Sequence, residues 1–314
     1  MPKITVTIPV YNVEKYISRC IDSVINQTFS DIEVIVVNDK TTDNSISIVE
    51  DFAKTDSRIR IIEHSENKGL MCARKTGYEN ASGDYVFFLD SDDSLPKDAL
   101  EVLYKEAVRT DADFVAGRLT YITPKGKDEK SFPCALKYGT DRVSAIKSTL
   151  LWELPHTLCG KLFRRELFLN KSFDTIDHYT NGEDGLLYYQ LIQCVKKVTC
   201  IDKCVYYYYR NSESSSQVKY SRKAIESIIY LYSYRYKTLI GIECLQRTLN
   251  FATIKDLSVL CGMGYSRKLL NEILSKSDIP YRLNVRTIIK YCGIANAIKC
   301  IIRVYFLSIY RNKE

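Results

Sequence analysis

Two patterns of apolar residues alternate along the first part of the chain. Short apolar runs, which are typical of buried strands, are followed by stretches in which apolar residues recur every three or four positions, as on one face of a helix. The runs predict strands over residues 4–10, 32–37, 59–62, 85–89 and 113–116, and the helical spacing predicts helices over 17–25, 43–54, 70–81 and 97–109. This order implies an α/β fold with a mostly parallel sheet flanked by helices.

The regular alternation ends at the polar stretch over residues 123–130, which predicts a loop or hairpin turn. Beyond it the pattern is mixed, with helices predicted over 144–151 and 184–194 and a strand over 205–209. From residue 220 onward the pattern is helical. We therefore expect an α/β domain over residues 1–217 and a helical C-terminal extension over residues 218–314.

The composition is that of a globular protein whose charge is unevenly distributed. The 314 residues are 46% hydrophobic and carry a net charge of +7. Residues 1–217 contain 28 Lys and Arg against 32 Asp and Glu, whereas residues 218–314 contain 17 against 6. A basic C-terminal third suggests an anionic partner, either nucleic acid or an anionic membrane surface.

Cysteine use and the hydropathy pattern predict where the protein works. The 11 cysteines form no CxxC pair, and Cys194, Cys200 and Cys204, which come closest, have no histidine nearby to complete a zinc site. This pattern fits a reducing cytoplasm. No charged and apolar leader precedes the first strand, and no apolar segment approaches the length of a membrane span. We expect a cytoplasmic protein that is soluble or lies on a membrane surface.

Three carboxylates, Asp90, Asp92 and Asp93, follow directly on the apolar run at residues 85–89. In open α/β sheets, ligands bind at the carboxyl ends of such strands. Carboxylates crowded there repel one another unless a cation joins them, and their hard oxygens suit Mg²⁺ or Mn²⁺ that carries a substrate's phosphates. The alternative is that the aspartates only cap the next helix, but Ser94 could supply that cap alone. We therefore favour a metal site.

Other side chains would suit a nucleotide diphosphate bound at the same sheet edge. Tyr11, which follows Pro9 at the end of the first strand, could lie near a base, and Asp39 at the end of the second strand would suit a base or ribose. Arg74, with Lys68 shortly before it, could face the phosphates or the metal-site carboxylates. Each of these clusters, taken alone, is also typical of an ordinary strand-to-helix turn.

Taken together and in this order, these clusters resemble the family 2 glycosyltransferases, which have the Rossmann-like GT-A fold. The resemblance rests on Ile-Pro-Val-Tyr-Asn at residues 8–12, Asn-Gln-Thr at 26–28, Asn-Lys-Gly-Leu at 67–70 and Phe-Leu-Asp-Ser-Asp-Asp at 88–93. It continues through residues 159–167, Gly-Glu-Asp at 182–184 and Tyr-Tyr-Tyr-Arg at 207–210. It implies a GT-A domain over residues 1–217, with a nucleotide-sugar half over about 1–120 and an acceptor half over about 121–217.

The resemblance also implies a role for each candidate residue. Asp92 would ligate the divalent metal, Mn²⁺ or Mg²⁺, that bridges the nucleotide diphosphate, and Asp90 would contact the ribose or the metal. The rest of the nucleotide-sugar site would be formed by Pro9, Tyr11, Asp39, Lys68 and Arg74. Asp184 would be the catalytic base that deprotonates the acceptor hydroxyl, with Glu183 orienting the acceptor or the base. Without the resemblance, Glu183 and Asp184 are typical of the first turn of a helix.

The implied reaction is inverting transfer of a hexose or N-acetylhexosamine from a UDP-sugar. The acceptor would be a hydroxyl of a lipid-linked or surface glycan, such as a bacterial O-antigen or capsule repeat, and the product a β-linkage. Two alternatives stay open, namely a non-catalytic nucleotide-sugar-binding or assembly module and a metal-dependent nuclease or polymerase. The excess of acidic residues over residues 1–217 argues against nucleic acid, because binding a phosphate backbone needs Lys and Arg around the chemistry.

The chain departs from the family pattern after the second strand. Asn38-Asp39-Lys40-Thr41 stands where the family usually has Asp-Asp-Gly-Ser. Asp39 retains the second aspartate, so we expect it to recognise uracil. Without the glycine, Lys40 must adopt an unfavourable backbone conformation or shift the turn.

The remaining conspicuous residues have plainer interpretations. Tyr206 to Tyr209 are interpreted as packing in preference to a sugar-stacking platform. His64, His156 and His178 lack metal-ligand spacing and are interpreted as structural or surface residues.

The C-terminal tail interleaves basic and apolar residues from Arg286 to Lys313. This basic amphipathic pattern suits binding in the plane of an anionic membrane, where apolar burial and cationic attraction add. The alternatives are a helix packed on its own domain or a dimer interface. With a membrane-anchored acceptor, we expect a peripheral protein on the cytoplasmic face of the bacterial inner membrane.

Overall fold

The computed structural model describes residues 1–123, 126–131, 139–169, 171–179, 181–210, 221–262 and 267–279. The chain divides into two compact units, Met1–Lys219 and Tyr220–Glu314. The first unit contains a mixed sheet with its helices, and the described part of the second unit contains helices only.

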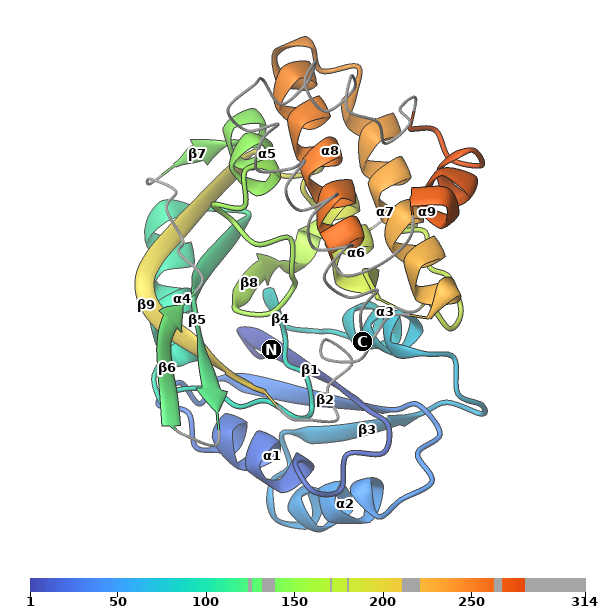
Figure 1. Ribbon diagram of the computed structural model, residues 1–314. Helices are drawn as coiled ribbons and strands as arrows, with labels where there is room; N and C mark the ends of the chain where they lie inside the picture. The colour runs from blue at the N-terminus through green and yellow to red at the C-terminus, as the bar shows by residue number, and fades with distance from the viewer. Residues whose placement is uncertain are drawn as a thin grey trace. The chain divides into compact units, whose positions relative to one another are not determined.

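The first unit begins with strands and helices in strict alternation. They are β1 (Ile4–Val10), α1 (Ile17–Ile25), β2 (Ile32–Asn38), α2 (Ser45–Thr55), β3 (Ile59–Glu63), α3 (Leu70–Glu79), β4 (Tyr85–Phe88) and α4 (Ala99–Thr110). The strands lie side by side in the order β3-β2-β1-β4, and all their pairings are parallel. In Figure 1, α1 and α2 lie on one side of β1–β3 and α3 lies on the other. The predicted α/β fold is therefore confirmed.

Burial on both faces explains why β2 and β4 are nearly continuous apolar runs. On β2, Val34 and Val36 pack into the large core cluster that includes α1, while Ile35 and Val37 pack with Ala73 of α3 on the opposite face. Each fully buried valine or isoleucine contributes about 1.5–3 kcal/mol relative to an exposed one. The frame around the sheet edge is therefore held by apolar packing on two sides.

The strand register aligns the carboxyl ends of the central strands. Val10 at the end of β1 is opposite Asn38 at the end of β2, and Thr7 of β1 is opposite Phe88 at the end of β4. Backbone bonds extend this alignment, because the Asp39 N–H donates to the Val10 carbonyl at 3.0 Å. The loops after β1, β2 and β4 consequently leave the sheet along one edge.

The second part of the first unit adds antiparallel pairings to the sheet. Its elements are β5 (Phe114–Thr123), β6 (Gly126–Ser131), β7 (Thr140–Asp141), α5 (Arg142–Leu150), β8 (Lys161–Arg164), the 3₁₀ turn η1 (Arg165–Leu167), α6 (Glu183–Leu191) and β9 (Lys197–Tyr209). The full order is β3-β2-β1-β4-β8-β5-β9-β7, with β6 paired to β5. β8 is antiparallel to both β4 and β5, whereas β5 and β9 are parallel. The sheet is parallel from β3 to β4 and mixed beyond.

Some predicted element bounds are wrong. The strand predicted over 205–209 is only the end of β9, because exposed Asp202 and Lys203 interrupt its apolar pattern. α4 begins at Ala99, two residues later than predicted, and Ser94 does not cap it. The side-chain carbonyl of Gln27 instead accepts from the Leu100 N–H at 3.1 Å. A cap supplied by a residue 73 positions away leaves no local sequence signal.

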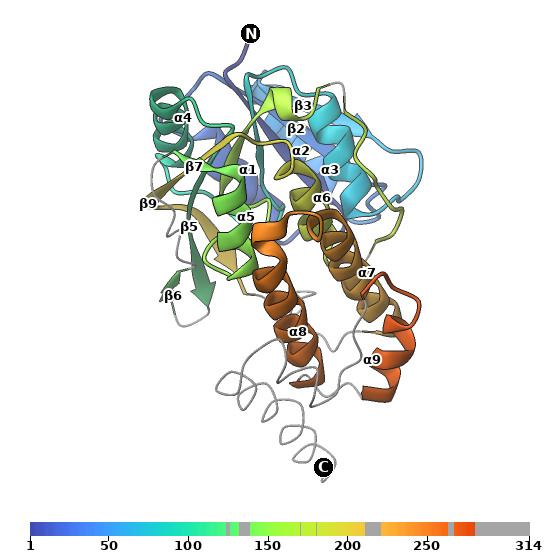
Figure 2. The ribbon, with the colours of Figure 1, turned by 90° about the horizontal axis from the view of Figure 1, so that it is seen from above.

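The second unit, in its described part, contains α7 (Arg222–Leu239), the 3₁₀ turn η2 (Glu243–Leu245), α8 (Gln246–Gly262) and α9 (Arg267–Leu274). α7 and α8 run side by side, and α9 lies next to α7 (Figure 1, Figure 2). A buried ion pair joins Arg235 of α7 to Asp256 of α8 at 2.7 Å. The helical character predicted for this region is confirmed over residues 221–262 and 267–279, whereas the basic tail over 286–313 lies outside the described residues. Within the described residues, no helix has the length and apolar character needed to cross a membrane.

Most of the cysteines that the structure describes are free thiols. Cys20, Cys72 and Cys159 are buried free thiols, whereas Cys200 is disulfide-bonded.

Candidate functional site

A cavity of about 800 Å³ opens at the edge where the parallel strands end. Of the candidates predicted from the sequence, its lining includes Pro9, Tyr11, Asp39, Arg74, Asp90, Asp92, Glu183 and Asp184. Lys68 is not part of the lining, although its backbone N–H donates to Asp39. Leu119, Tyr121 and Tyr208, from β5 and β9, also face the cavity. The structure thus brings residues from both halves of the first unit to one hollow.

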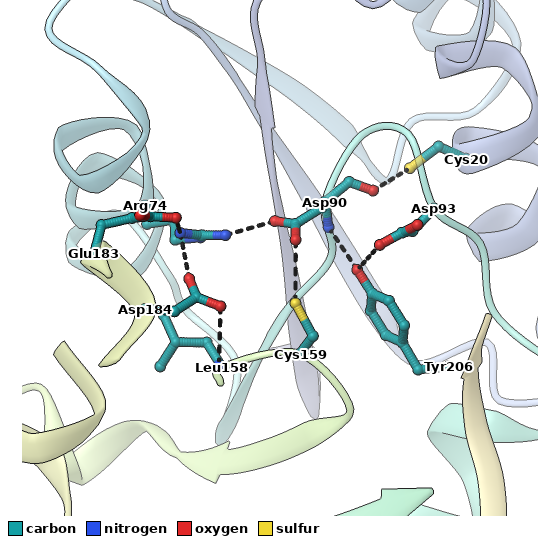
Figure 3. Close-up of polar contacts among 9 residues, drawn as sticks. All are labelled: Cys20, Arg74, Asp90, Asp93, Leu158, Cys159, Glu183, Asp184 and Tyr206. Carbon is teal, nitrogen blue, oxygen red and sulfur yellow. Dashed lines mark hydrogen bonds and ion pairs between the residues drawn. The ribbon is translucent and has the colours of Figure 1, made fainter. Parts of the chain in front are cut away.

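The turn after β4 is held by the hydroxyl group of a tyrosine from β9. The Asp93 N–H donates to the Asp90 carbonyl at 3.0 Å and closes the turn. The buried Tyr206 hydroxyl donates to Asp93 Oδ2 at 2.8 Å and accepts from the Asp90 N–H at 3.1 Å (Figure 3). Asp93 Oδ1 accepts from the Tyr209 N–H at 2.8 Å. Burial, together with Asp92 and Asp90, raises the pKa of Asp93 well above its usual value. Asp93 therefore supports the turn and is not part of the cavity lining.

Arg74 of α3 joins the carboxylates of the turn to those of α6. Its side chain is 2% exposed, and Nη2 lies 2.7 Å from Asp90 Oδ1. Nη1 lies 3.4 Å from Glu183 Oε1 and also pairs with Asp184 Oδ1 (Figure 3). Burial alone would lower the pKa of Arg74, but Asp184, Asp90 and Glu183 outweigh it and hold that pKa well above its usual value. Arg74 is a permanent cation shared by three carboxylates.

Asp184 lies in the first turn of α6, at the wall of the cavity. Gly182 begins this helix at φ +105°, a left-handed conformation that costs glycine little. Burial raises the pKa of Asp184 to about 7, with Arg74 opposing the rise and Glu183 and Asp90 adding to it. The Leu158 N–H donates weakly to Asp184 Oδ2 at 3.4 Å. A carboxyl with such a pKa can exchange a proton near neutral pH.

The segment before β8 contacts the turn through a thiol. Cys159 Sγ lies 3.2 Å from Asp90 Oδ2, while Cys20 Sγ lies 3.6 Å from the Asp90 carbonyl oxygen (Figure 3). Burial raises the pKa of Cys159 well above its usual value, and Asp90 and Asp184 add to the effect. Cys159 therefore stays a thiol and donates its hydrogen to Asp90.

Asp90 and Asp92 fit a divalent metal that binds together with a diphosphate. Among the described residues, no group of three or more His, Cys, Asp and Glu side chains could hold a metal by itself. Mg²⁺, however, is commonly bound by one or two carboxylates with substrate phosphates as its further ligands. Burial raises the pKa of Asp92 to about 6, and the charge of Asp90 adds to the rise. A cation beside this pair would relieve that repulsion.

Asp39 is buried at the end of β2 and faces the same cavity. Its Oδ1 accepts from the Lys68 N–H at 2.9 Å and its Oδ2 from the Gly69 N–H at 2.8 Å. Gly69 has φ +88°, and an added Cβ would lie 3.1 Å from the backbone of His178. Lys40 takes the unfavourable left-handed conformation, φ +61°, which was one of the two predicted outcomes. The turn is therefore kept without glycine, at a cost in backbone strain.

Sequence reasoning missed several residues around the cavity. Tyr206 was interpreted as packing, but its hydroxyl supports the Asp90–Asp93 turn. His64, interpreted as structural or surface, lies against Asp39, and Cys159 lies against Asp90. The only signal for Cys159 was its membership of a motif shared with the resembling family, and Tyr206 lies just before another such motif, at residues 207–210. His64 gave none, because its partner is 25 residues away.

Comparison with known proteins identifies relatives of the chain. The model of glycosyl transferase family 2 matches residues 5–169. The chain is 30% identical over 315 residues to the uncharacterized glycosyltransferase EpsJ of Bacillus subtilis, covering 95% of this chain and 87% of EpsJ. It is 36% identical over 255 residues to the glycosyltransferase GlyA of Streptococcus pneumoniae, covering 76% of this chain and 35% of GlyA. The chain thus spans about a third of that relative's length.

A solved structure shares the fold. Residues 1–349 of S. aureus TarS, in complex with UDP-GlcNAc, align with a TM-score of 0.65 at 19% identity, covering 99% of this chain and 92% of TarS 1–349. The likeness shows that this chain has the same fold as TarS 1–349.

Proposed function

The chain belongs to glycosyl transferase family 2, and on that premise we propose that it transfers a hexose or N-acetylhexosamine from a UDP-sugar to a glycan hydroxyl, with inversion. One observation carries the proposal. Asp90 and Asp92, which follow β4, and Asp184, at the start of α6, line a single cavity, and Arg74 links Asp90 to Asp184. A diphosphate site and a base are thereby held at a fixed separation by rigid elements.

The donor would lie along the strand ends. Tyr11, 46% exposed, offers an aromatic surface to the base, and Asp39 offers a carboxylate acceptor. Uracil presents its N3–H as a hydrogen-bond donor, so a carboxylate acceptor complements it. The UDP-GlcNAc bound by TarS, which shares the fold, supports a uridine nucleotide.

The chemistry would be a single displacement. The acceptor hydroxyl gives its proton to the Asp184 carboxylate while its oxygen attacks the anomeric carbon, and the bond from that carbon to the β-phosphate oxygen breaks to release UDP. Attack on the face opposite the leaving group inverts the anomeric carbon, so an α-linked donor gives a β-linkage. A pKa of about 7 leaves a large share of Asp184 ionised at neutral pH.

The leaving UDP needs cationic stabilisation. We propose that Asp90 and Asp92 hold Mn²⁺ or Mg²⁺, which when bound would offset the charge that develops on the diphosphate. Arg74 holds Asp90 in place and favours the ionised form of Asp184. The same guanidinium therefore orients both ends of the site.

The acceptor would enter past β5 and β9. Tyr121 and Tyr208 line that part of the cavity with their rings 5.5 Å apart, which supports a sugar acceptor over a small polar molecule. We propose a lipid-linked or surface glycan, with the protein peripheral on the cytoplasmic face of the inner membrane through its basic tail. That part of the proposal rests on the family and on the sequence of residues 286–313.

A panel of UDP-, GDP- and CDP-sugars tests the proposal. We expect UDP release from one UDP-sugar, dependent on Mn²⁺ or Mg²⁺ and abolished by EDTA, and strongly reduced in Asp92→Asn. Binding of a UDP-sugar without turnover under any of these conditions would instead indicate a non-catalytic binding module. Tight, salt-sensitive binding to DNA would favour the nuclease or polymerase alternative.

A further inference from the structure

His64 occupies a buried position behind Asp39. It follows β3, and its Nδ1 lies 2.7 Å from Asp39 Oδ1 while its Nε2 lies 2.8 Å from Thr76 Oγ1 of α3. The side chains of His64 and Asp39 are 8% and 4% exposed. The backbone N–H of His64 also donates to the Asn38 carbonyl at 2.9 Å. Hydrogen bonds therefore hold this residue through its backbone and through both ring nitrogens.

The partners of His64 fix the direction of these hydrogen bonds. An ionised carboxylate only accepts, so His64 Nδ1 must carry the hydrogen that it shares with Asp39. In a neutral ring Nε2 is then the acceptor, and the Thr76 hydroxyl donates to it. The chain of donors runs from Thr76 through His64 to Asp39 and ends at the cavity.

These bonds use most of the accepting capacity of Asp39. Oδ1 accepts from His64 Nδ1 and from the Lys68 N–H, and Oδ2 accepts from the Gly69 N–H. Each carboxylate oxygen has about two acceptor sites, which leaves one on Oδ2. Asp39 lines the cavity, so a ligand that brings a hydrogen-bond donor can fill this remaining site.

We propose that His64 is a positioning residue that makes the donor site selective for a base with an N–H facing Asp39, as uracil has, over one with a bare nitrogen there, as cytosine has. The proposal rests on the UDP-sugar function proposed above and assigns part of its base selectivity to His64. By holding Oδ1, His64 keeps Asp39 from rotating and keeps it an acceptor. Cytosine presents the N3 lone pair to that oxygen and is repelled.

Three substitutions separate the N–H from the bulk of the ring. His64→Asn places an amide nitrogen where Nδ1 lies and retains the bond to Asp39. His64→Leu fills the space without a donor, and His64→Gln places its amide nitrogen near Nε2, out of reach of Asp39. The hydrogen bond to the carboxylate is charge-assisted, so its loss should weaken UDP binding about tenfold or more.

Calorimetric titration with UDP and with CDP, each in the presence of Mn²⁺, tests the proposal. We expect wild type to prefer UDP, His64→Asn to keep that preference within about threefold, and His64→Leu and His64→Gln to lose about tenfold in UDP affinity with little change for CDP. In turnover, His64→Leu should raise KM for the UDP-sugar and leave kcat nearly unchanged, which a general loss of structure would not do.

Other outcomes would refute either the role of His64 or the proposed donor. A preference for UDP over CDP in folded His64→Leu equal to that of wild type would overturn the proposal, as would a loss in His64→Asn as large as in His64→Leu. If His64→Leu does not fold, the same comparison is made between His64→Asn and His64→Gln. Failure of wild type itself to bind UDP would refute the proposed donor, and is distinguished from failure of the role of His64 by the wild-type titration alone.

Discussion

Replacing Arg74 by methionine would remove the only cation that touches Asp90, Glu183 and Asp184 among the described residues. Methionine retains much of the buried stem but leaves these carboxylates, whose side chains are 23%, 17% and 17% exposed, without their shared partner. Breaking a buried ion pair by removing one partner typically costs about 3–5 kcal/mol. We expect a loss of this size at pH 8, which corresponds to roughly 10 °C in Tm for a unit of this length.

The loss should depend on pH in a definite direction. Arg74 lowers the pKa of Asp184, so its removal raises that pKa further above the value in the unfolded chain. A carboxyl with a raised folded-state pKa makes the folded state bind more protons, and stability then falls as the pH rises through the interval between the two values. The destabilisation should therefore be largest at pH 8 and smaller at pH 5, where Asp184 is protonated in the folded state.

Urea unfolding of wild type, Arg74→Met and Arg74→Lys at pH 5 and pH 8 measures both effects. Lysine keeps the charge, but its single ammonium cannot span from Asp90 to Asp184, so Arg74→Lys should lie between the other two. A stability loss in Arg74→Met that is equal at both pH values, or greater at pH 5, would refute the electrostatic reasoning. A negligible loss at pH 8 would refute the shared ion pair itself.

Further predictions concern the turn, the backbone and the tail. Tyr206→Phe keeps the ring but removes the hydroxyl between Asp90 and Asp93, so the Mn²⁺ concentration for half-maximal turnover should rise roughly tenfold; an unchanged Mn²⁺ titration would contradict this. Lys40→Gly relieves the strain of a left-handed backbone, but glycine also gives the unfolded chain more conformational freedom, which opposes the gain. The net stabilisation measured by urea unfolding should be about 0.5 kcal/mol. Deletion of residues 286–314 should move the protein from the membrane to the soluble fraction, and unchanged membrane recovery would remove the tail as the anchor.

The parts of the fold that follow from local pattern could be predicted from the sequence. Apolar runs identified β1 to β4, and the rule that ligands bind where parallel strands end predicted that Tyr11, Asp39, Asp90 and Asp92 would gather around one hollow. The N-terminal part of β9, before residue 205, was missed because exposed Asp202 and Lys203 interrupt its apolar pattern. Local periodicity reports burial, and it fails where a strand runs through solvent.

The rest of the site depends on contacts between distant segments. The role of Asp184 was predicted from the family resemblance alone, because a carboxylate in the first turn of a helix is ordinary. Arg74 was expected to face phosphates or the metal-site carboxylates, and it contacts Asp90, but its pairing with Glu183 spans 109 residues. Tyr206 contacts Asp93 across 113 residues. Such pairs are set by how β9 and α6 pack, and no spacing rule in one sequence encodes them.

Proton NMR of the first product, which reports its anomeric configuration, tests inverting transfer most directly. Wild type and Asp184→Asn are each incubated with Mn²⁺ and the α-linked UDP-sugar found in the donor panel. Water can serve as the acceptor, so no glycan needs to be known. We predict that wild type releases UDP and the β-anomer before mutarotation sets in, and that Asp184→Asn lowers the rate by about 10²–10⁴-fold. Release of the α-anomer, or an unaltered rate in Asp184→Asn, would contradict inverting transfer with Asp184 as the base.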